Sequence, residues 1–242
     1  MTDYDAATYG DRMAEVYDEW FAVPSDTEDT VEFLSDLAGT GPVLELGIGT
    51  GRVALPLAQR GHEVHGVDAS EAIVEKLRTK SRDIPVTIGD FAELDVEGEF
   101  HLVYVVFNTF FALLSQEEQV RCFENVARRL DEGGAFVIEA FVPDMTRWDR
   151  DQRMEAHHVE NDSVVLDVSR HDPVEQRVTA NHLVVSEAGV KMYPVRLRYA
   201  WPSELDLMAR LAGLRLRERW SGWRREPFTA SSVEHVSVYT AI

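Results

Sequence analysis

The sequence is poor in cysteine and in basic residues. Cys122 is the single cysteine among 242 residues, which excludes a disulfide framework; its neighbours Val120 and Phe123 suit a half-buried structural thiol. Lysine and arginine number 24 against 43 acidic residues, which gives a formal charge of −19. This charge argues against nucleic acid as a partner, because phosphate backbones are bound by clustered lysine and arginine. An acidic surface also serves solubility or salt tolerance, so charge alone names no substrate.

Long apolar runs are absent as well. No run reaches the length that spans a bilayer, and the opening MTDYDAATYG has neither the basic nor the apolar region of a secretory signal. We therefore predict a cytoplasmic protein with no membrane partner. The length suits one α/β domain with an appendage.

The stretch from Val43 to Gly61, VLELGIGTGRVALPLAQRG, is the centre of the sequence pattern. A short apolar run leads into glycines spaced G-x-G-x-G, and apolar residues then recur at helical spacing. This predicts a strand, a tight turn and a helix, with backbone amides at the turn facing a ligand. The spacing differs from the G-x-G-x-x-G of dinucleotide-binding proteins, and no G-x-x-x-x-G-K-[ST] phosphate loop occurs.

Two further strands follow, each ending in an acidic residue. Residues 63–67 predict a strand that leads into Asp68, about twenty residues after the glycines. A carboxylate at this place can accept hydrogen bonds from both hydroxyls of a ribose. Ser70 is a good helix cap, and residues 86–88 then form a short strand that ends at Gly89-Asp90. A glycine turn with a downstream aspartate also occurs at ordinary strand–helix junctions, so these elements carry weight only in combination.

Residues from these segments form one pattern: Glu45, Gly47, Gly49, Gly51, Asp68, Ala69, Asp90 and Phe91. Over roughly residues 40–140, the pattern resembles the class I S-adenosylmethionine-dependent methyltransferases. In that family the first acidic residue and the glycines hold the methionine end of the cofactor, the next aspartate holds the ribose, and the last pair lies against adenine. The resemblance implies S-adenosyl-L-methionine as the cofactor.

Residues 1–36 form an acidic segment in which Arg12 is the only basic side chain. Apolar and aromatic residues recur there every three to four positions, which predicts one amphipathic helix from Tyr9 to Phe21. The segment also resembles the lid of some methyltransferases, and this implies that Tyr17 faces the sulfonium of the cofactor. A helix that only packs on the domain is the alternative interpretation.

The middle of the chain continues the alternation of strands and helices. The nearly apolar residues 100–107 predict a strand buried on both faces, whose carboxyl end places Asn108 where an acceptor meets the methyl group. Asn108 alternatively only caps the loop; the N-P-P-[YF] motif of amino-methylating enzymes is not matched, because both prolines are missing. A capping box at Ser115 predicts a helix through Leu130 that stops at Gly133-Gly134, before a strand over residues 135–142.

The hydrophobic period changes from about residue 159. Residues 164–168, 177–185 and 191–199 alternate apolar with polar, which predicts three antiparallel strands with one wet face. This insertion after the fifth strand looks like that of small-molecule N-methyltransferases, including those acting on nucleotide-linked amino sugars and on glycine. The resemblance makes Arg198 and Tyr199 candidate acceptor-binding residues. A homodimer interface is the competing interpretation of such a sheet.

The predicted fold is therefore α/β: a Rossmann-like, doubly wound, mostly parallel sheet with a small antiparallel insertion. A helix starting at Pro202 and a closing strand pair complete it. We divide the chain into a helical lid over residues 1–36, a cofactor-binding domain over residues 37–150 and 201–242, and an acceptor-side insertion over residues 151–200.

The residues set limits on the chemistry. Transfer from a sulfonium is an in-line displacement, so positioning and desolvation supply much of the acceleration, and a base is optional for an amine but useful for a hydroxyl. The catalytic residue stays unassigned. The histidines that are candidates for a base, each as readily a surface or structural residue, are His157, His158, His171 and His182. We predict no metal, because Phe107-Asn108 ends its strand without a flanking pair of aspartates.

The sequence thus predicts a methyltransferase acting on an amine or hydroxyl of a small molecule, such as an antibiotic-type metabolite or an amino sugar. One alternative is an NAD-dependent oxidoreductase, which the glycine spacing and the lack of an evident Tyr-x-x-x-Lys pair count against. The other alternative is a cofactor-binding protein without catalysis.

Overall fold

The computed structural model describes residues 4–21 and 26–242; residues 1–3 and 22–25 of the predicted lid lie outside that part. The helices are α1 (Thr8–Met13), α2 (Tyr17–Trp20), α3 (Thr27–Ala38), α4 (Ala54–Gln59), α5 (Glu71–Lys80), α6 (Gln116–Ala127) and α7 (Pro202–Leu211), with 3-10 turns η1 (Thr109–Ala112) and η2 (Met145–Arg147). The strands are β1 (Val43–Leu46), β2 (Val64–Asp68), β3 (Val86–Ile88), β4 (Phe100–Val105), β5 (Leu130–Phe141), β6 (Gln152–Val159), β7 (Ser163–Asp172), β8 (Arg177–Ser186), β9 (Gly189–Arg198), β10 (Leu214–Trp220) and β11 (Glu234–Ala241).

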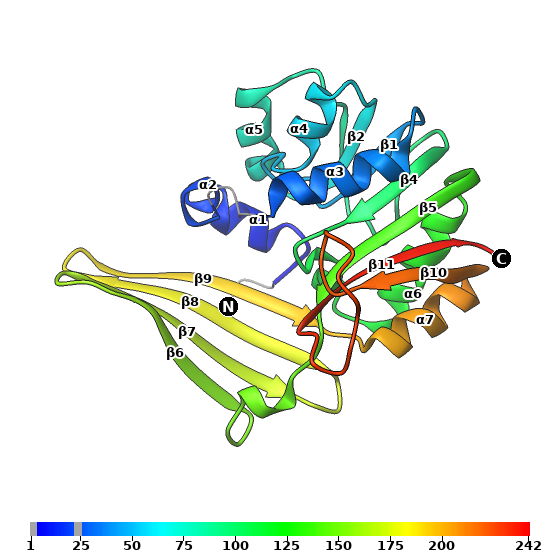
Figure 1. Cartoon of the computed structure of the whole chain (residues 1–242). Helices are drawn as coiled ribbons and strands as arrows, with labels where there is room; N and C mark the ends of the chain where they lie inside the picture. Colours follow the sequence, from blue (N-terminus) through cyan, green and yellow to red (C-terminus); the bar gives the residue numbers. More distant parts are fainter. Residues whose placement is uncertain (1–3, 22–25) are drawn as a thin grey trace.

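The main sheet has seven strands in the order β10-β11-β5-β4-β1-β2-β3. Strands β1 to β5 are parallel, whereas β11 runs antiparallel to β5 and β10 antiparallel to β11. Helices α3, α4 and α5 cover one face, and α6 and α7 cover the other (Figure 1). The predicted doubly wound, mostly parallel fold is confirmed. The chain leaves β1 toward β2 and β3 on one side and returns to β4 on the other, which is the point where such sheets bind ligands.

Local sequence signals fix the ends of several helices. Ser70 caps α5 by accepting a hydrogen bond from the backbone N–H of Ile73 at 3.2 Å, and Ser115 and Glu118 form the predicted capping box of α6. The predicted end of α6 is wrong: the helix stops at Ala127, and Gly133-Gly134 lie inside β5. Pairing between Phe100 and Leu130 starts the strand earlier, and the register shifts after it.

The insertion is a second sheet of four strands, in the order β6-β7-β8-β9, which extends from the domain as an arm (Figure 1). Three of its strands match the predicted ones, but β7 continues to Asp172, beyond the predicted end at residue 168. The prediction missed β6. Its residues are almost all exposed, so this edge strand carries no alternation of apolar and polar positions that sequence reading can detect.

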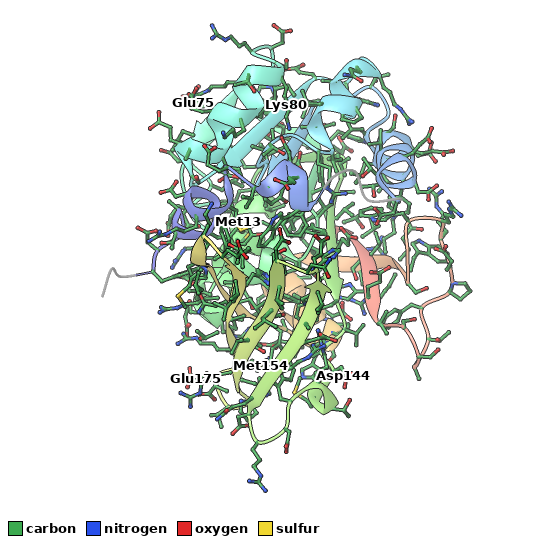
Figure 2. The ribbon with its side chains drawn as sticks, turned by 90° about the vertical axis from the view of Figure 1, so that its left-hand side faces the viewer. Met13, Glu75, Lys80, Asp144, Met154 and Glu175 are labelled. Atoms are coloured by element: carbon green, nitrogen blue, oxygen red, sulfur yellow. The ribbon has the colours of Figure 1, made fainter. Side chains whose placement is uncertain are left out.

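The N-terminal segment is not the single helix that we predicted. Its chain turns after Met13, and α2 starts only at Tyr17. Helix α1 packs against both α5 and β9, and Figure 2 shows Met13 between the strands of the insertion and α5. Gly10 allows this close approach, because a Cβ there would lie 2.4 Å from the Cβ of Ser70. These contacts explain the break between α1 and α2. The spacing of apolar side chains every three to four residues predicted a helix but carried no information about where it ends.

A buried histidine on β11 makes stability depend on pH. Burial lowers the pKa of His235 to about 3, and within the described residues its Nε2 atom has no hydrogen-bond partner. The unfolded chain therefore takes up a proton below about pH 6.5 that the folded chain refuses. We expect this group to remove about 2 kcal/mol of unfolding free energy between pH 7 and pH 5. Urea denaturation at both values should show a smaller loss for His235→Gln; equal losses would contradict the prediction.

No helix in residues 4–21 or 26–242 is both long and apolar enough to cross a bilayer.

Candidate active site

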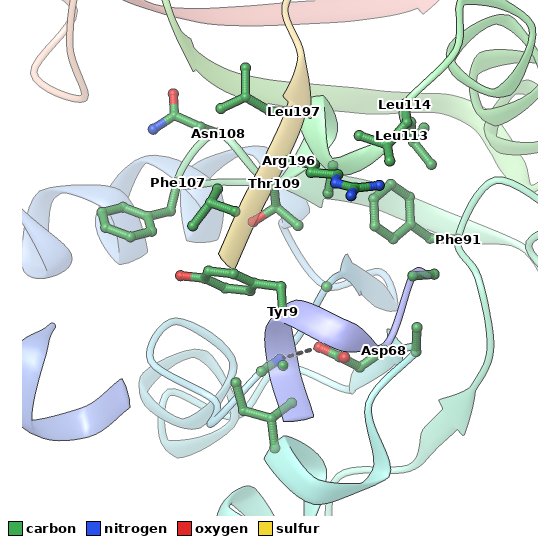
Figure 3. A pocket seen from close by; sticks show the side chains of 18 of the residues that line it. Tyr9, Asp68, Phe91, Phe107, Asn108, Thr109, Leu113, Leu114, Arg196 and Leu197 are labelled. Carbon is green, nitrogen blue, oxygen red and sulfur yellow. Dashed lines mark hydrogen bonds between the residues drawn. The ribbon is translucent and has the colours of Figure 1, made fainter. Parts of the chain in front are cut away.

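A cavity of about 450 Å³ opens at the carboxyl edge of the main sheet. It lies where loops after β1, β2 and β4 meet α1, α2 and the end of β9, and its volume is in the range of ligand pockets, roughly 300–1,000 Å³. Figure 3 shows Tyr9 in the middle of the view, with Asp68 to one side and Thr109 and Leu197 to the other. Chain segments that are far apart in sequence thus form one cavity.

Asp68 ties the glycine turn to the end of β2. Its Oδ2 accepts a hydrogen bond from the Gly49 N–H at 2.8 Å, drawn as the dashed line in Figure 3, and its Oδ1 accepts one from the Ser70 N–H at 2.9 Å. Burial raises the pKa of Asp68, and these backbone hydrogen bonds oppose the rise. The carboxylate therefore shapes the turn as well as lining the cavity.

The turn glycines cannot be replaced without strain. Gly47 and Gly49 line the cavity at φ of +72° and +55°, in the left-handed region that favours glycine. A Cβ at Gly47 would also meet the Cγ2 atom of Thr109 at 2.4 Å. Gly51, at φ +83°, does not line the cavity and lies against Leu77, where a Cβ would be 2.4 Å from Cδ1. Gly47 and Gly49 thus shape the cavity, whereas Gly51 allows close packing against Leu77.

One buried and one half-buried glutamate, Glu45 and Glu139, lie on strands of the main sheet. Glu45 on β1 accepts a hydrogen bond from the Tyr104 hydroxyl at 2.8 Å, and burial raises its pKa to about 8. Glu139 on β5 accepts hydrogen bonds from the Phe107 N–H at 2.7 Å and the Trp223 indole N–H at 3.1 Å, and burial raises its pKa too. The backbone donor from Phe107 shows that Glu139 fixes the loop after β4.

That loop is held in an unusual conformation. Phe107 and Asn108 have φ of +57° and +64°, which is uncommon for residues other than glycine. The Oδ1 atom of Asn108 accepts a hydrogen bond from the Phe141 N–H at 2.7 Å, and this contact joins the ends of β4 and β5. Asn108 is thus a loop anchor and also lines the cavity, which leaves its side-chain NH₂ as the group able to donate to a ligand.

Aromatic side chains from the N-terminal helices form a wall of the cavity. Tyr9, Tyr17 and Phe21 line it, and burial raises the pKa of Tyr17 to about 12. The ring of Phe21 meets the rings of Tyr17 and Phe107 at centroid distances of 4.9 and 5.2 Å. Neutral phenols and aromatic faces of this kind exclude water and favour a positively charged ligand.

Comparison with known proteins gives the family. A methyltransferase-domain model matches residues 43–134. The cypemycin N-terminal methyltransferase of a Streptomyces species is 31% identical over 240 residues, which cover 97% of this chain and 98% of the relative. The chain belongs to the class I S-adenosylmethionine-dependent methyltransferases. The resemblance seen in the sequence is confirmed, and S-adenosylmethionine is the cofactor of this methyltransferase.

Solved structures agree with this assignment. The CcbJ methyltransferase from Streptomyces caelestis matches with 45% sequence identity and a TM-score of 0.93, over 98% of this chain and 99% of that one. The sugar N-methyltransferase KedS8 from a Streptoalloteichus species matches with 20% identity and a TM-score of 0.68, over 98% of each chain. At 20% identity, the match to KedS8 shows a shared fold and nothing more.

The cavity of the methyltransferase fits its cofactor. A carboxylate at the end of β2 suits ribose hydroxyls, and the bare backbone at Gly47 and Gly49 allows a close approach. The predicted cofactor residues that line the cavity are Tyr17, Gly47, Gly49, Asp68, Ala69, Asp90 and Phe91. Glu45 and Gly51 do not line it: Glu45 lies behind the turn in contact with Tyr104. Their direct contact with the cofactor remains a prediction.

The structure does not bring Arg198 and Tyr199 to the cavity. Arg198 is buried, where it pairs with Glu204 of α7 at 2.7 Å and donates to the Gln119 side chain at 2.6 Å. The Tyr199 hydroxyl is within hydrogen-bond distance of the His171 ring at 2.9 Å. Both side chains join the insertion to the domain, because β9 ends where α7 must dock. Neither side chain lines the cavity, so the structure does not support their predicted role in acceptor binding.

Several residues that line the cavity were not among the predicted site residues. Tyr9 had a signal, as one of the aromatic residues in the N-terminal segment. Leu197 and Arg196 had none, because only the tertiary placement of β9 brings the end of this strand to the cavity. His182 was one of four candidate histidines, and it alone of the four lines the cavity. Among the described residues, no group of three or more His, Cys, Asp or Glu side chains is arranged to hold a metal ion.

Proposed function

We propose that this methyltransferase transfers the methyl group to an amine nitrogen of a small specialised metabolite. One observation carries the proposal: the charged groups that line the cavity are mostly carboxylates. Asp5 and Glu118 line it in addition to the predicted cofactor residues Asp68 and Asp90, and Arg196 is the sole guanidinium or ammonium among the described lining residues. Such a lining favours a cationic ligand, and an amine is cationic near neutral pH. The name of the cypemycin relative also states an N-terminal acceptor.

The residues of the chain act mainly by positioning. When bound, the cofactor supplies an electrophilic methyl group on a sulfonium. Asp68 and the glycine turn would hold its ribose and methionine ends, and Asp90 with Phe91 would hold the adenine. Tyr17, the first residue of α2, would face the sulfonium. The aromatic wall there would exclude water and keep the reacting atoms close together. The acceptor would enter from the side of Arg196 and His182.

A panel of acceptors tests the proposal. Short peptides with a free N-terminus, amino-acid amides and 4-amino sugar nucleotides would each be incubated with the enzyme and S-adenosylmethionine. We expect a mass increase of one methyl on at least one amine and none on its N-acetyl derivative. Methylation of the matched hydroxyl compounds alone would contradict the amine assignment. Cofactor binding without turnover across the panel would favour a non-catalytic protein.

The division of the chain is part of the proposal: residues 1–36 form a lid, residues 37–150 and 201–242 bind the cofactor, and residues 151–200 form the acceptor side. Four contacts of the lid with the cofactor-binding part support it. Asp18 accepts a hydrogen bond from the Thr50 hydroxyl and pairs with Lys80, each at 2.6 Å. Ser70 donates to Asp11 at 2.6 Å, and Glu15 pairs with Lys76 at 2.8 Å.

Removing the Asp18 contacts should loosen the lid. In Asp18→Ala, we expect amide exchange in α2 to speed up severalfold without cofactor and to slow on addition of S-adenosylhomocysteine. Glu19→Ala, a change at an exposed neighbour, is the matched control. Exchange that is unaffected by both the substitution and the ligand would favour a helix that is merely packed on the domain.

A homodimer and a cytoplasmic location complete the proposal. The exposed edge strand β6 of the insertion sheet supports pairing of two chains. Light scattering of the purified chain at several concentrations tests the dimer, and a constant monomer mass would contradict it.

A further inference from the structure

A polar pair lies on the face of the insertion that meets the cavity. His182 of β8 lines the cavity, and Asp167 of β7 is its direct partner across the antiparallel ladder. Cβ atoms of such partners are about 4.5–5.5 Å apart, so the two side chains lie next to each other on the same face. Val178 and Ala180, which share this face of β8, pack in the core next to the domain. The pair therefore lies where the insertion begins to leave the core.

One carboxylate oxygen of Asp167 has no hydrogen-bond donor among the described residues. Its Oδ2 atom is 3.9 Å from the Nε2 atom of His157, and its Oδ1 atom is buried with no hydrogen-bond partner in the described part of the chain. A buried carboxylate oxygen without a donor is costly. A protonated imidazole at His182 would supply the donor that this oxygen lacks.

A residue of the lid also packs against the imidazole. The Trp20 ring of α2 packs edge-on against the rings of His182 and Tyr193, at centroid distances of 6.1 and 4.9 Å. Tyr17, three residues earlier on the same helix, lines the cavity near the glycine turn. Helix α2 thus sets His182 in a fixed relation to the place where the methyl group is expected.

We propose that His182 takes the proton from the acceptor nitrogen, and that Asp167 is the positioning residue that holds the ring and stabilises its protonated form. The inference rests on the proposed amine acceptor. It assigns a residue to the catalytic role that the sequence left open.

The proton balance of the reaction gives His182 a defined task. An amine enters as an ammonium ion without a free lone pair, and one N–H proton passes to a ring nitrogen of His182. The freed lone pair then forms the nitrogen–carbon bond while the sulfur–carbon bond breaks and its electron pair stays on sulfur. The products are a methylated ammonium and a neutral thioether, and the proton leaves His182 to solvent when the site opens.

The surroundings of His182 suit a ring that is neutral before the reaction. Burial lowers the pKa of His182, the Asp167 carboxylate opposes this shift, and His157 adds to it. Other titratable groups on the facing elements include Glu155 on β6, which is the ladder partner of Asp167, Tyr193 and Arg196 on β9, and Tyr17, Asp18 and Glu19 on α2. Asp18 is paired with Lys80.

Turnover with the amine that the panel identifies provides the first test. We expect His182→Gln to lower kcat by at least about 100-fold with cofactor affinity changed less than about threefold, the range for loss of an acid–base group. In wild type, kcat should fall at acidic pH as His182 becomes protonated, which gives the pH profile an acidic limb. This limb should be absent in His182→Gln. Asp167→Asn should lower kcat about tenfold, as for an orienting partner, and move that limb to lower pH. His158→Gln, an exposed histidine on the same sheet, is the matched control.

Titration of the imidazole gives a second test that needs no acceptor. In protein with ¹³C-labelled histidine and bound S-adenosylhomocysteine, the NMR titration of His182 should move to lower pH in Asp167→Asn and stay unchanged in His158→Gln. An unchanged titration in Asp167→Asn, or His182→Gln with wild-type turnover of the same amine, would overturn the inference and leave the proposed function intact. If no amine in the panel is methylated, the proposed function fails, and the inference fails with it.

Discussion

Replacing Asp68 with alanine is expected to weaken binding of S-adenosylmethionine by about 1.5 to 3 kcal/mol, or roughly 10- to 150-fold. The loss has two sources. The carboxylate is the expected partner of the ribose hydroxyls, and it also accepts the backbone N–H groups of Gly49 and Ser70 at 2.8 and 2.9 Å. Without it, the turn loses the contact that holds its open shape.

Calorimetric titration with S-adenosylmethionine measures the effect, and thermal denaturation checks the fold. Asp83→Ala is a suitable control, because Asp83 is an exposed aspartate that lies outside the cavity. Unchanged affinity in a stable Asp68→Ala protein would remove Asp68 from the site, and much of the argument from the glycine turn with it.

Replacing Arg198 with methionine is expected to lower the free energy of unfolding by about 2 to 4 kcal/mol, because it leaves the Glu204 carboxylate without its cation and the Gln119 side-chain oxygen without its donor in a mostly buried site. The side chains of Arg198 and Glu204 are only 7% and 16% exposed, so water replaces little of the lost interaction. For a chain of this size, the midpoint of thermal unfolding should fall by roughly 4 to 16 °C.

The same variant should bind S-adenosylmethionine with wild-type affinity, since Arg198 does not line the cavity. Arg210→Met, at an exposed position of α7, should change stability by less than about 0.5 kcal/mol and serves as the control. A stable Arg198→Met protein with a raised acceptor KM would restore the role in acceptor binding that the sequence suggested.

The cofactor half of the site could be predicted because its chemistry is local in sequence. A glycine turn, the residue that ends the next strand and the pair after the third strand each follow from short-range constraints. Parallel pairing of β1, β2 and β3 then brings them to one edge. Gly47, Gly49, Asp68 and Asp90 all line the cavity for this reason.

The acceptor half could not be predicted in the same way. Arg198 and Tyr199 lie at the end of β9, where one residue of register decides whether a side chain faces the cavity or the core. The ladder turns Leu197 toward the cavity and Arg198 toward α6 and α7. His182 stood out from the other histidines only once its strand was placed beside the lid. The break between α1 and α2 likewise depends on packing against α5 and β9, which periodicity does not contain.

Titration of the wild-type chain with S-adenosylmethionine and, separately, with NAD tests the central claim most directly, because both cofactors are bound by related folds at the same edge of the sheet. The account predicts saturable binding of one S-adenosylmethionine per chain, weakened in Asp68→Ala, and no measurable binding of NAD. Saturable binding of NAD, with no heat from S-adenosylmethionine, would contradict it.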